Sequence, residues 1–203
     1  MAERVPASLL GALADLVKWL ESAQISAMVI GGVASSFLGR PRMTQDVDAL
    51  AILPENKWDA ATEAARNFGI VPRIDQAVDF ARRSRVLLLK HVQSDIAIDV
   101  ILGGLPFEQE AVDRARAHLV GDISVRLPRV EDLIIMKVIA HRDKDMQDVE
   151  GLLDAHPEVN FDEIRQYVSE FATATSMSEL IDDFERLLQQ RKRKQPGPRP
   201  RPK

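Results

Sequence analysis

The chain has 203 residues, of which 45% are hydrophobic and 29% charged, a balance that is typical of a globular protein and excludes a disordered or fibrous chain. It contains no cysteine, which excludes a disulfide scaffold, a zinc–thiolate site and thiol catalysis. The net charge is −4, but residues 191–203 hold seven of the 27 lysines and arginines and no acid, so the rest of the chain is strongly acidic.

The first predicted element is an amphipathic helix over residues 8–20, where leucines recur at helical spacing. Asp15 and Lys18 interrupt the apolar stretch, so the segment is unsuited to a signal peptide, and it is too short to cross a bilayer. From this segment we expect a cytoplasmic protein with no membrane partner.

Strands and helices alternate after this helix. We expect strands at 27–30, 48–53, 86–92, 96–102 and 124–127, the third and fourth joined as a hairpin, and helices at 33–38, 57–68, 107–118, 129–141, 146–155, 161–173 and 178–191. This order predicts an α/β (α+β) core over 1–127 and a helical C-terminal portion over 128–190. Residues 191–203 are predicted to form a disordered basic, proline-rich tail, which either contacts an anionic partner such as RNA or DNA, or only aids solubility.

The first functional signal is the pair Gly31-Gly32, which stands where a buried strand ends and a helix begins. Glycine lets the backbone approach a ligand closely, and the free N–H groups at a helix start favour phosphate. Taken alone, a glycine pair is more often a plain turn.

The second signal is a set of three carboxylates. Asp46 and Asp48 are two residues apart at the start of a predicted strand, so their side chains share a face. Asp99 lies in the middle of the apolar strand 96–102, where a lone carboxylate is costly to bury unless it is paired or bound to metal. If the two strands are neighbours, the three acids converge on a site for Mg²⁺ or Mn²⁺ of the two-metal type.

These residues resemble the nucleotidyltransferase (DNA polymerase β-like) superfamily, and within it the AbiEii/MenA-type toxin nucleotidyltransferases and their uncharacterised relatives. The resemblance covers residues 25–155. It includes the glycine pair, the string Arg42-x-Thr44-x-Asp46-x-Asp48, and a later helix with Lys137 followed by the charged run 142–148. It implies a mixed β-sheet with flanking helices in the core 1–127.

The resemblance also implies an activity, the Mg²⁺-dependent transfer of a nucleoside monophosphate from a nucleoside triphosphate to a hydroxyl of RNA, tRNA or protein. As a toxin, the chain would have a cognate antitoxin. The implied metal ligands are Asp46, Asp48 and Asp99, the last of them as a general base or third ligand, and Lys137 would neutralise phosphate. The implied nucleotide-binding residues are Gly31, Gly32, Ser36, Arg42, Thr44 and Asp145.

Several alternatives stay open. The chain could be a non-catalytic member of this fold that binds nucleotide or nucleic acid. Lys137 could reach solvent as a structural lysine rather than point into the site, and Arg142 or Lys144 could pair with Asp145 and Asp148 in a purely structural junction. A haloacid dehalogenase-type phosphohydrolase, which also uses Asp-x-Asp, is excluded because here the apolar run follows the acids instead of preceding them.

Overall fold

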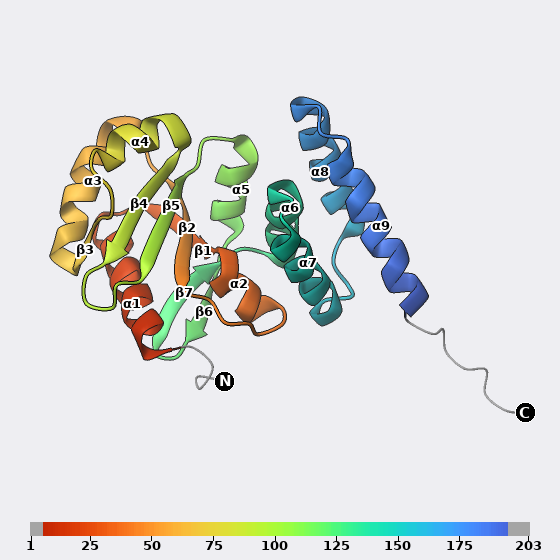
Figure 1. Cartoon of the computed structure of the whole chain (residues 1–203), viewed down its shortest axis with the longest axis horizontal. Helices are drawn as coiled ribbons and strands as arrows, with labels where there is room; N and C mark the ends of the chain where they lie inside the picture. The colour runs from red at the N-terminus through yellow and green to blue at the C-terminus, as the bar shows by residue number, and fades with distance from the viewer. Residues whose placement is uncertain (1–5, 195–203) are drawn as a thin grey trace, which may run out of the picture. The chain divides into compact units, whose positions relative to one another are not determined.

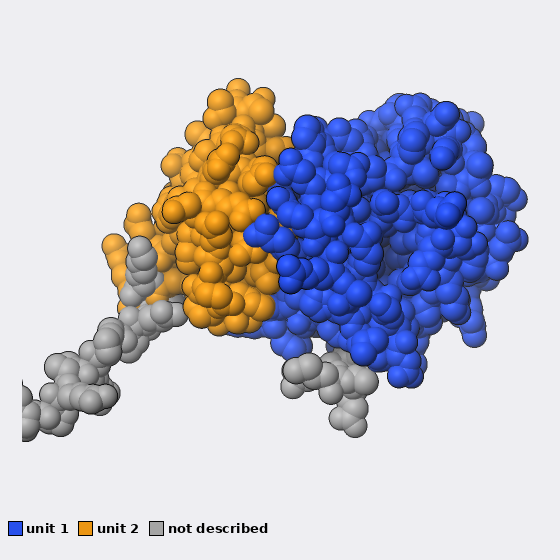
Figure 2. Space-filling model, turned by 180° about the vertical axis from the view of Figure 1, so that it is seen from behind, with its two compact units in different colours: residues 1–129 blue, residues 130–203 orange. Residues whose placement is uncertain are grey.

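A computed structural model describes residues 6–194. The chain divides into two compact units, residues 1–129 and residues 130–203, which are coloured separately in Figure 2. No helix among the described residues has the length and apolar character that a bilayer span requires.

The first unit holds a five-stranded mixed sheet, a two-stranded sheet and five α-helices within its described part (Figure 1). The strands are β1 (Ser26–Ile30), β2 (Asp46–Ile52), β3 (Ile70–Pro72), β4 (Val86–His91), β5 (Ala97–Leu102), β6 (Arg116–Val120) and β7 (Ile123–Leu127). The helices are α1 (Ala7–Ser22), α2 (Gly31–Leu38), α3 (Trp58–Ala65), α4 (Ala77–Ser84) and α5 (Pro106–Arg114), with short 3₁₀ turns η2 (Glu55–Lys57) and η3 (Arg66–Phe68). This architecture confirms the predicted fold class.

The large sheet has the strand order β1-β2-β5-β4-β3. The β2–β5 pair is parallel, while β1–β2, β5–β4 and β4–β3 are antiparallel. The predicted hairpin of β4 and β5 is confirmed. The strand that carries Asp99 is the neighbour of the strand that carries Asp46 and Asp48, which is the condition for the three acids to converge. Figure 1 shows β2 and β5 side by side in the centre of the sheet.

Side-chain alternation gives the two faces of this sheet different roles. Ala51, Val100 and Leu102 surround one small apolar cavity together with Trp19 and Leu20 of α1. The Trp19 indole Nε1 also donates to the Ala61 carbonyl oxygen at 3.0 Å, which ties α1 to α3. Helices α1 and α3 therefore cover one face of β2 and β5, and the residues between these positions along each strand point to the other face.

Two parts of the first unit differ from the sequence prediction. Strand β3 and helix α4 were not predicted. Strand β3 has only three residues and ends at Pro72, so it has no pattern that would reveal it. The helix predicted over 107–118 is wrong in its last part, since α5 ends at Arg114 and Arg116 begins β6. All residues of β6 except Val120 are exposed, so the strand has no hydrophobic alternation to reveal it, and its pairing with β7 determines it.

The second unit consists of helices within its described part, namely α6 (Val130–Ala140), α7 (Asp143–Ala155), α8 (Phe161–Thr175) and α9 (Glu179–Lys194). Its core contains Ile134, Leu152, Val168 and Phe184, all fully buried. Helix α9 continues to Lys194, into the range predicted as tail. Arg191 donates to the carbonyl oxygens of Glu150 at 3.1 Å and Leu153 at 2.8 Å, so this basic residue caps the last turn of α7 instead of belonging to a tail. The rest of the predicted tail, 195–203, lies outside the described residues.

Candidate active site

The three predicted carboxylates lie on one face of the central strand pair. In the parallel ladder of β2 and β5, Asp48 is the direct partner of Asp99, and Asp46 is two residues away on the same face. All three are partly exposed, whereas Val47 and Ile98, which point to the opposite face, are fully buried. The strand register therefore brings together the acids that the sequence places far apart, on the face that α1 and α3 leave open.

The glycine pair lies directly against this face. Ile30, the last residue of β1, pairs with Asp48, and Gly31 begins α2 with a φ of +63°. A Cβ on Gly31 would stand 1.8 Å from Oδ2 of Asp48, and a Cβ on Gly32 would stand 2.5 Å from Oγ1 of Thr44. Gly31 is needed for its backbone conformation, and Gly32 is needed so that the Thr44 side chain can approach the backbone.

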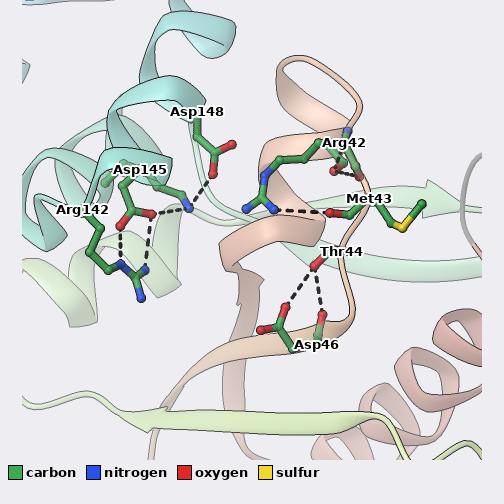
Figure 3. Close-up of polar contacts among 9 residues, drawn as sticks. Arg42, Met43, Thr44, Asp46, Arg142, Asp145 and Asp148 are labelled. Carbon is green, nitrogen blue, oxygen red and sulfur yellow. Dashed lines mark hydrogen bonds and ion pairs between the residues drawn. The ribbon is translucent and has the colours of Figure 1, made fainter.

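The loop between α2 and β2 is held by hydroxyl groups (Figure 3). The Ser36 hydroxyl donates to the Arg42 carbonyl oxygen at 3.0 Å and accepts from the Arg42 amide at 3.4 Å. The Thr44 hydroxyl lies 3.0 Å from Oδ1 of Asp46 and 3.3 Å from the backbone oxygen of Asp46. Both oxygens are acceptors, and they share the single hydroxyl proton of Thr44. Ser36 and Thr44, predicted to contact nucleotide, thus also shape the loop that orients Asp46.

Asp99 has a partner that the sequence analysis did not identify. The Arg73 guanidinium donates to Oδ1 of Asp99 at 2.7 Å. Burial raises the pKa of Asp99 above its ordinary value, and the negative charge of Asp46 adds to this rise, while the charge and hydrogen bond of Arg73 oppose it. Arg73 follows Pro72 in a segment without hydrophobic periodicity, so no sequence signal pointed to it.

The donor set suits a divalent cation in its chemistry. Carboxylate oxygens are the ligands that Mg²⁺ and Mn²⁺ prefer, and the register places three of them on one face of two adjacent strands. Within residues 6–194, however, no three acidic or histidine side chains are gathered as closely as a metal site needs. One oxygen of Asp99 is engaged by Arg73.

Lys137 and Asp145 lie in the second unit, where they pair with one another. The Lys137 Nζ donates to Oδ1 of Asp145 and to Oδ2 of Asp148, each at 2.8 Å, and all three side chains are almost fully buried. Arg142 donates to both oxygens of Asp145 from the other side (Figure 3). Burial alone would raise the pKa of Asp145, but the hydrogen bonds and charges of Arg142 and Lys137 outweigh it and hold this pKa below its ordinary value.

The sequence matches one protein family over most of its length. The model of a family described as "Nucleotidyl transferase of unknown function (DUF2204)" matches residues 9–183. No curated protein is significantly similar to the sequence.

Two solved structures share the fold. The solution structure of the antibiotic-resistance factor ANT(2'')-Ia is 13% identical, covers 81% of this chain and 91% of its own, and has a TM-score of 0.54. The crystal structure of ANT(2'')-Ia in complex with adenylyl-2''-tobramycin is also 13% identical, with 79% and 95% coverage and a TM-score of 0.53. At this identity the similarity is one of fold.

Proposed function

The chain belongs to this family of nucleotidyl transferases, a class of phosphorus-group transferases, and from this premise we propose that it moves a nucleoside monophosphate from a nucleoside triphosphate to a hydroxyl acceptor. The observation that carries the proposal is the placement of Asp46, Asp48 and Asp99 on one face beside Gly31. A phosphate cradle next to hard oxygen donors is the combination that nucleotidyl transfer needs.

In this proposal, the start of α2 binds the triphosphate. Gly31 and Gly32 leave space where a side chain would otherwise stand, and the first amides of α2 face a negatively charged group favourably. Arg42 adds positive charge from the loop that Ser36 holds. Thr44 keeps the Asp46 carboxylate oriented through its hydroxyl.

The carboxylates divide the remaining tasks. Asp46 and Asp48 would hold Mg²⁺ or Mn²⁺, and Asp99 would act as the third ligand or accept the proton of the acceptor hydroxyl. When bound, the cation would neutralise part of the triphosphate charge and lower the pKa of a hydroxyl group bound to it. The raised pKa of Asp99 supports the role of proton acceptor, because a base is most effective when its pKa approaches the working pH.

The test compares matched asparagine substitutions in a transfer assay with labelled nucleoside triphosphates and Mg²⁺ or Mn²⁺. We expect D46N and D48N each to lower transfer by roughly 100-fold or more, since the loss of a metal-binding carboxylate exceeds the 10–100-fold effect of its supporting partners. Asp122 lies exposed in the turn between β6 and β7, so D122N serves as the control and should keep full activity. Undiminished transfer by both D46N and D48N would refute the proposed site.

The acceptor and the biological role come from the resemblance to toxin nucleotidyltransferases. It predicts RNA, tRNA or a protein hydroxyl as the acceptor, and a cognate antitoxin as a partner. Incubation with an RNA pool and, separately, with purified protein, followed by electrophoresis, shows which polymer takes the label. A small DNA-binding protein encoded upstream of this chain would support the toxin–antitoxin assignment.

The alternative is a non-catalytic module of the same fold that binds nucleotide or nucleic acid. The Arg73–Asp99 ion pair favours it, because it occupies one of the three acids. Calorimetry separates the two functions: this alternative predicts binding of nucleoside triphosphate with no transfer to any acceptor. Transfer that D46N abolishes excludes it.

A further inference from the structure

Arg73 reaches the central acids from the edge of the sheet. Its backbone amide donates to the Leu88 carbonyl oxygen of β4 at 3.1 Å, and Leu88 is the register partner of Asp99. The Arg73 side chain then extends past β4 to the carboxylate on β5, where Nη2 lies 2.7 Å from Oδ1. The backbone of Arg73 is thus anchored, and its side chain alone determines the contact.

The Arg73–Asp99 ion pair contributes little to the stability of the fold. Both side chains are about one-third exposed, at 31% for Arg73 and 29% for Asp99. An ion pair with this much exposure to water is worth little in free energy of unfolding. Within residues 6–194 the guanidinium of Arg73 has Asp99 as its single partner. The main effect of the ion pair is therefore on the charge of the sheet face that carries Asp46, Asp48 and Asp99, and not on the position of β3.

Arg73 also has room to leave Asp99. It lines an open pocket of about 860 Å³ that is formed largely by Val71, Pro72 and the residues from Ile74 to Asp79. Asp75, an exposed acid, lines the same pocket and offers a second place for a positive charge. The side chain is therefore not confined to one position by packing.

The Arg73–Asp99 ion pair lowers the negative charge that attracts a divalent cation to this face. Three ionised carboxylates carry −3, and Arg73 reduces the local charge to −2 while engaging one Asp99 oxygen. We propose that Arg73 is a positioning residue that orients Asp99 before substrate binds and competes with a divalent cation for this carboxylate. This inference rests on the proposed function, because it takes Asp99 as part of a metal-binding face.

The test measures Mn²⁺ binding to the full chain without nucleotide, at one neutral pH, by electron paramagnetic resonance. We expect R73Q to bind Mn²⁺ about tenfold more tightly than the wild type, because one opposing charge a few ångströms away is removed. R73K keeps the charge on a shorter side chain and should lie between the two. Arg66 lines the same pocket but pairs with Glu63 at 2.9 Å, so R66Q is the matched control and should not change the affinity.

A second set of variants tests whether the effect passes through Asp99. In a D99N background, R73Q should give a clearly smaller gain in affinity, because the carboxylate that Arg73 engages is gone and only the repulsion between Arg73 and the cation is relieved. An R73Q variant with unchanged or weaker Mn²⁺ affinity, a gain of undiminished size in D99N, or no Mn²⁺ binding by any variant would overturn the proposal. Failure of nucleotidyl transfer would refute the proposed function separately, since the binding measurement needs no turnover.

Discussion

At the scale of single residues, Gly31 is the position where backbone conformation and chemistry coincide. Its φ of +63° disfavours any side chain, and its missing Cβ is the space beside which the Asp48 carboxylate lies. The two demands are separable, because Gly121 has nearly the same φ, +62°, with no atom within 4 Å of where a Cβ would stand.

We therefore expect G31A and G121A to differ. Both should lose about 1–2 kcal/mol of unfolding free energy through the left-handed backbone, and G31A should lose more, because the new methyl group displaces Asp48. G31A should also abolish most transfer activity, whereas G121A should keep it. Chemical denaturation and the transfer assay measure the two effects, and equal activity of both variants would contradict the assigned role of Gly31.

At the scale of elements, the charged run that starts α7 has a structural use. Lys137 of α6 and Asp145 and Asp148 of α7 form a buried cluster in which the Lys137 charge meets two carboxylates, so it joins the two helices. A buried charge without its partner is expensive, so each member depends on the others. The ion pair of Arg142 with Asp145 agrees with the alternative in which the run is a structural junction, while phosphate neutralisation by Lys137 stays a prediction.

The cluster predicts a large effect of K137M on stability. We expect a loss of about 3–5 kcal/mol of unfolding free energy, because the substitution leaves two carboxylates buried without their lysine. K18M is the control, since Lys18 is 63% exposed in its ion pair with Asp15 and should change stability by at most about 1 kcal/mol. Similar losses in both variants would show that the cluster is not what holds α6 to α7.

The same cluster predicts a dependence on pH. The folded-state pKa of Asp145 lies below the ordinary value of 3.8, so the unfolded chain takes up its proton first as the pH falls. The stability that Asp145 contributes is full above that ordinary value and disappears as the pH drops toward the folded-state pKa. Denaturation curves should show a loss of stability over this window that is smaller in D145N, and an identical pH dependence in D145N would contradict it.

At the scale of the whole molecule, charge is distributed unevenly along the chain. Residues 128–190 carry most of the acidic excess, while Arg199, Arg201 and Lys203 follow the end of α9 in sequence. Such a basic segment contacts nucleic acid by releasing counterions, which makes the binding depend on salt.

We expect removal of residues 195–203 to weaken binding to single-stranded RNA. The slope of log affinity against log salt should become shallower by about 2, since three cations contribute about 0.7 each. The triple substitution R199Q/R201Q/K203Q keeps the length and should act like the truncation. If neither variant changes the slope, the segment only aids solubility, which a precipitation assay would show.

Much of the fold followed from local patterns in the sequence. Periodicity predicted the hairpin of β4 and β5 and the helices of the second unit, because each of these elements buries one of its own faces. Strands β3 and β6 were missed, since one is very short and the other almost fully exposed, so their partners and not their own residues define them.

The sequence by itself determined the chemistry of the candidate site, namely a glycine pair before a helix, Asp46 and Asp48 on one face of a strand, and a third acid in an apolar strand. Local spacing decides these features. Only the tertiary structure decided that Asp99 stands opposite Asp48, that Arg73 contacts Asp99, and that Lys137 lies between Asp145 and Asp148. Strand register and long side chains bring together residues far apart in the chain, and no local pattern encodes such contacts.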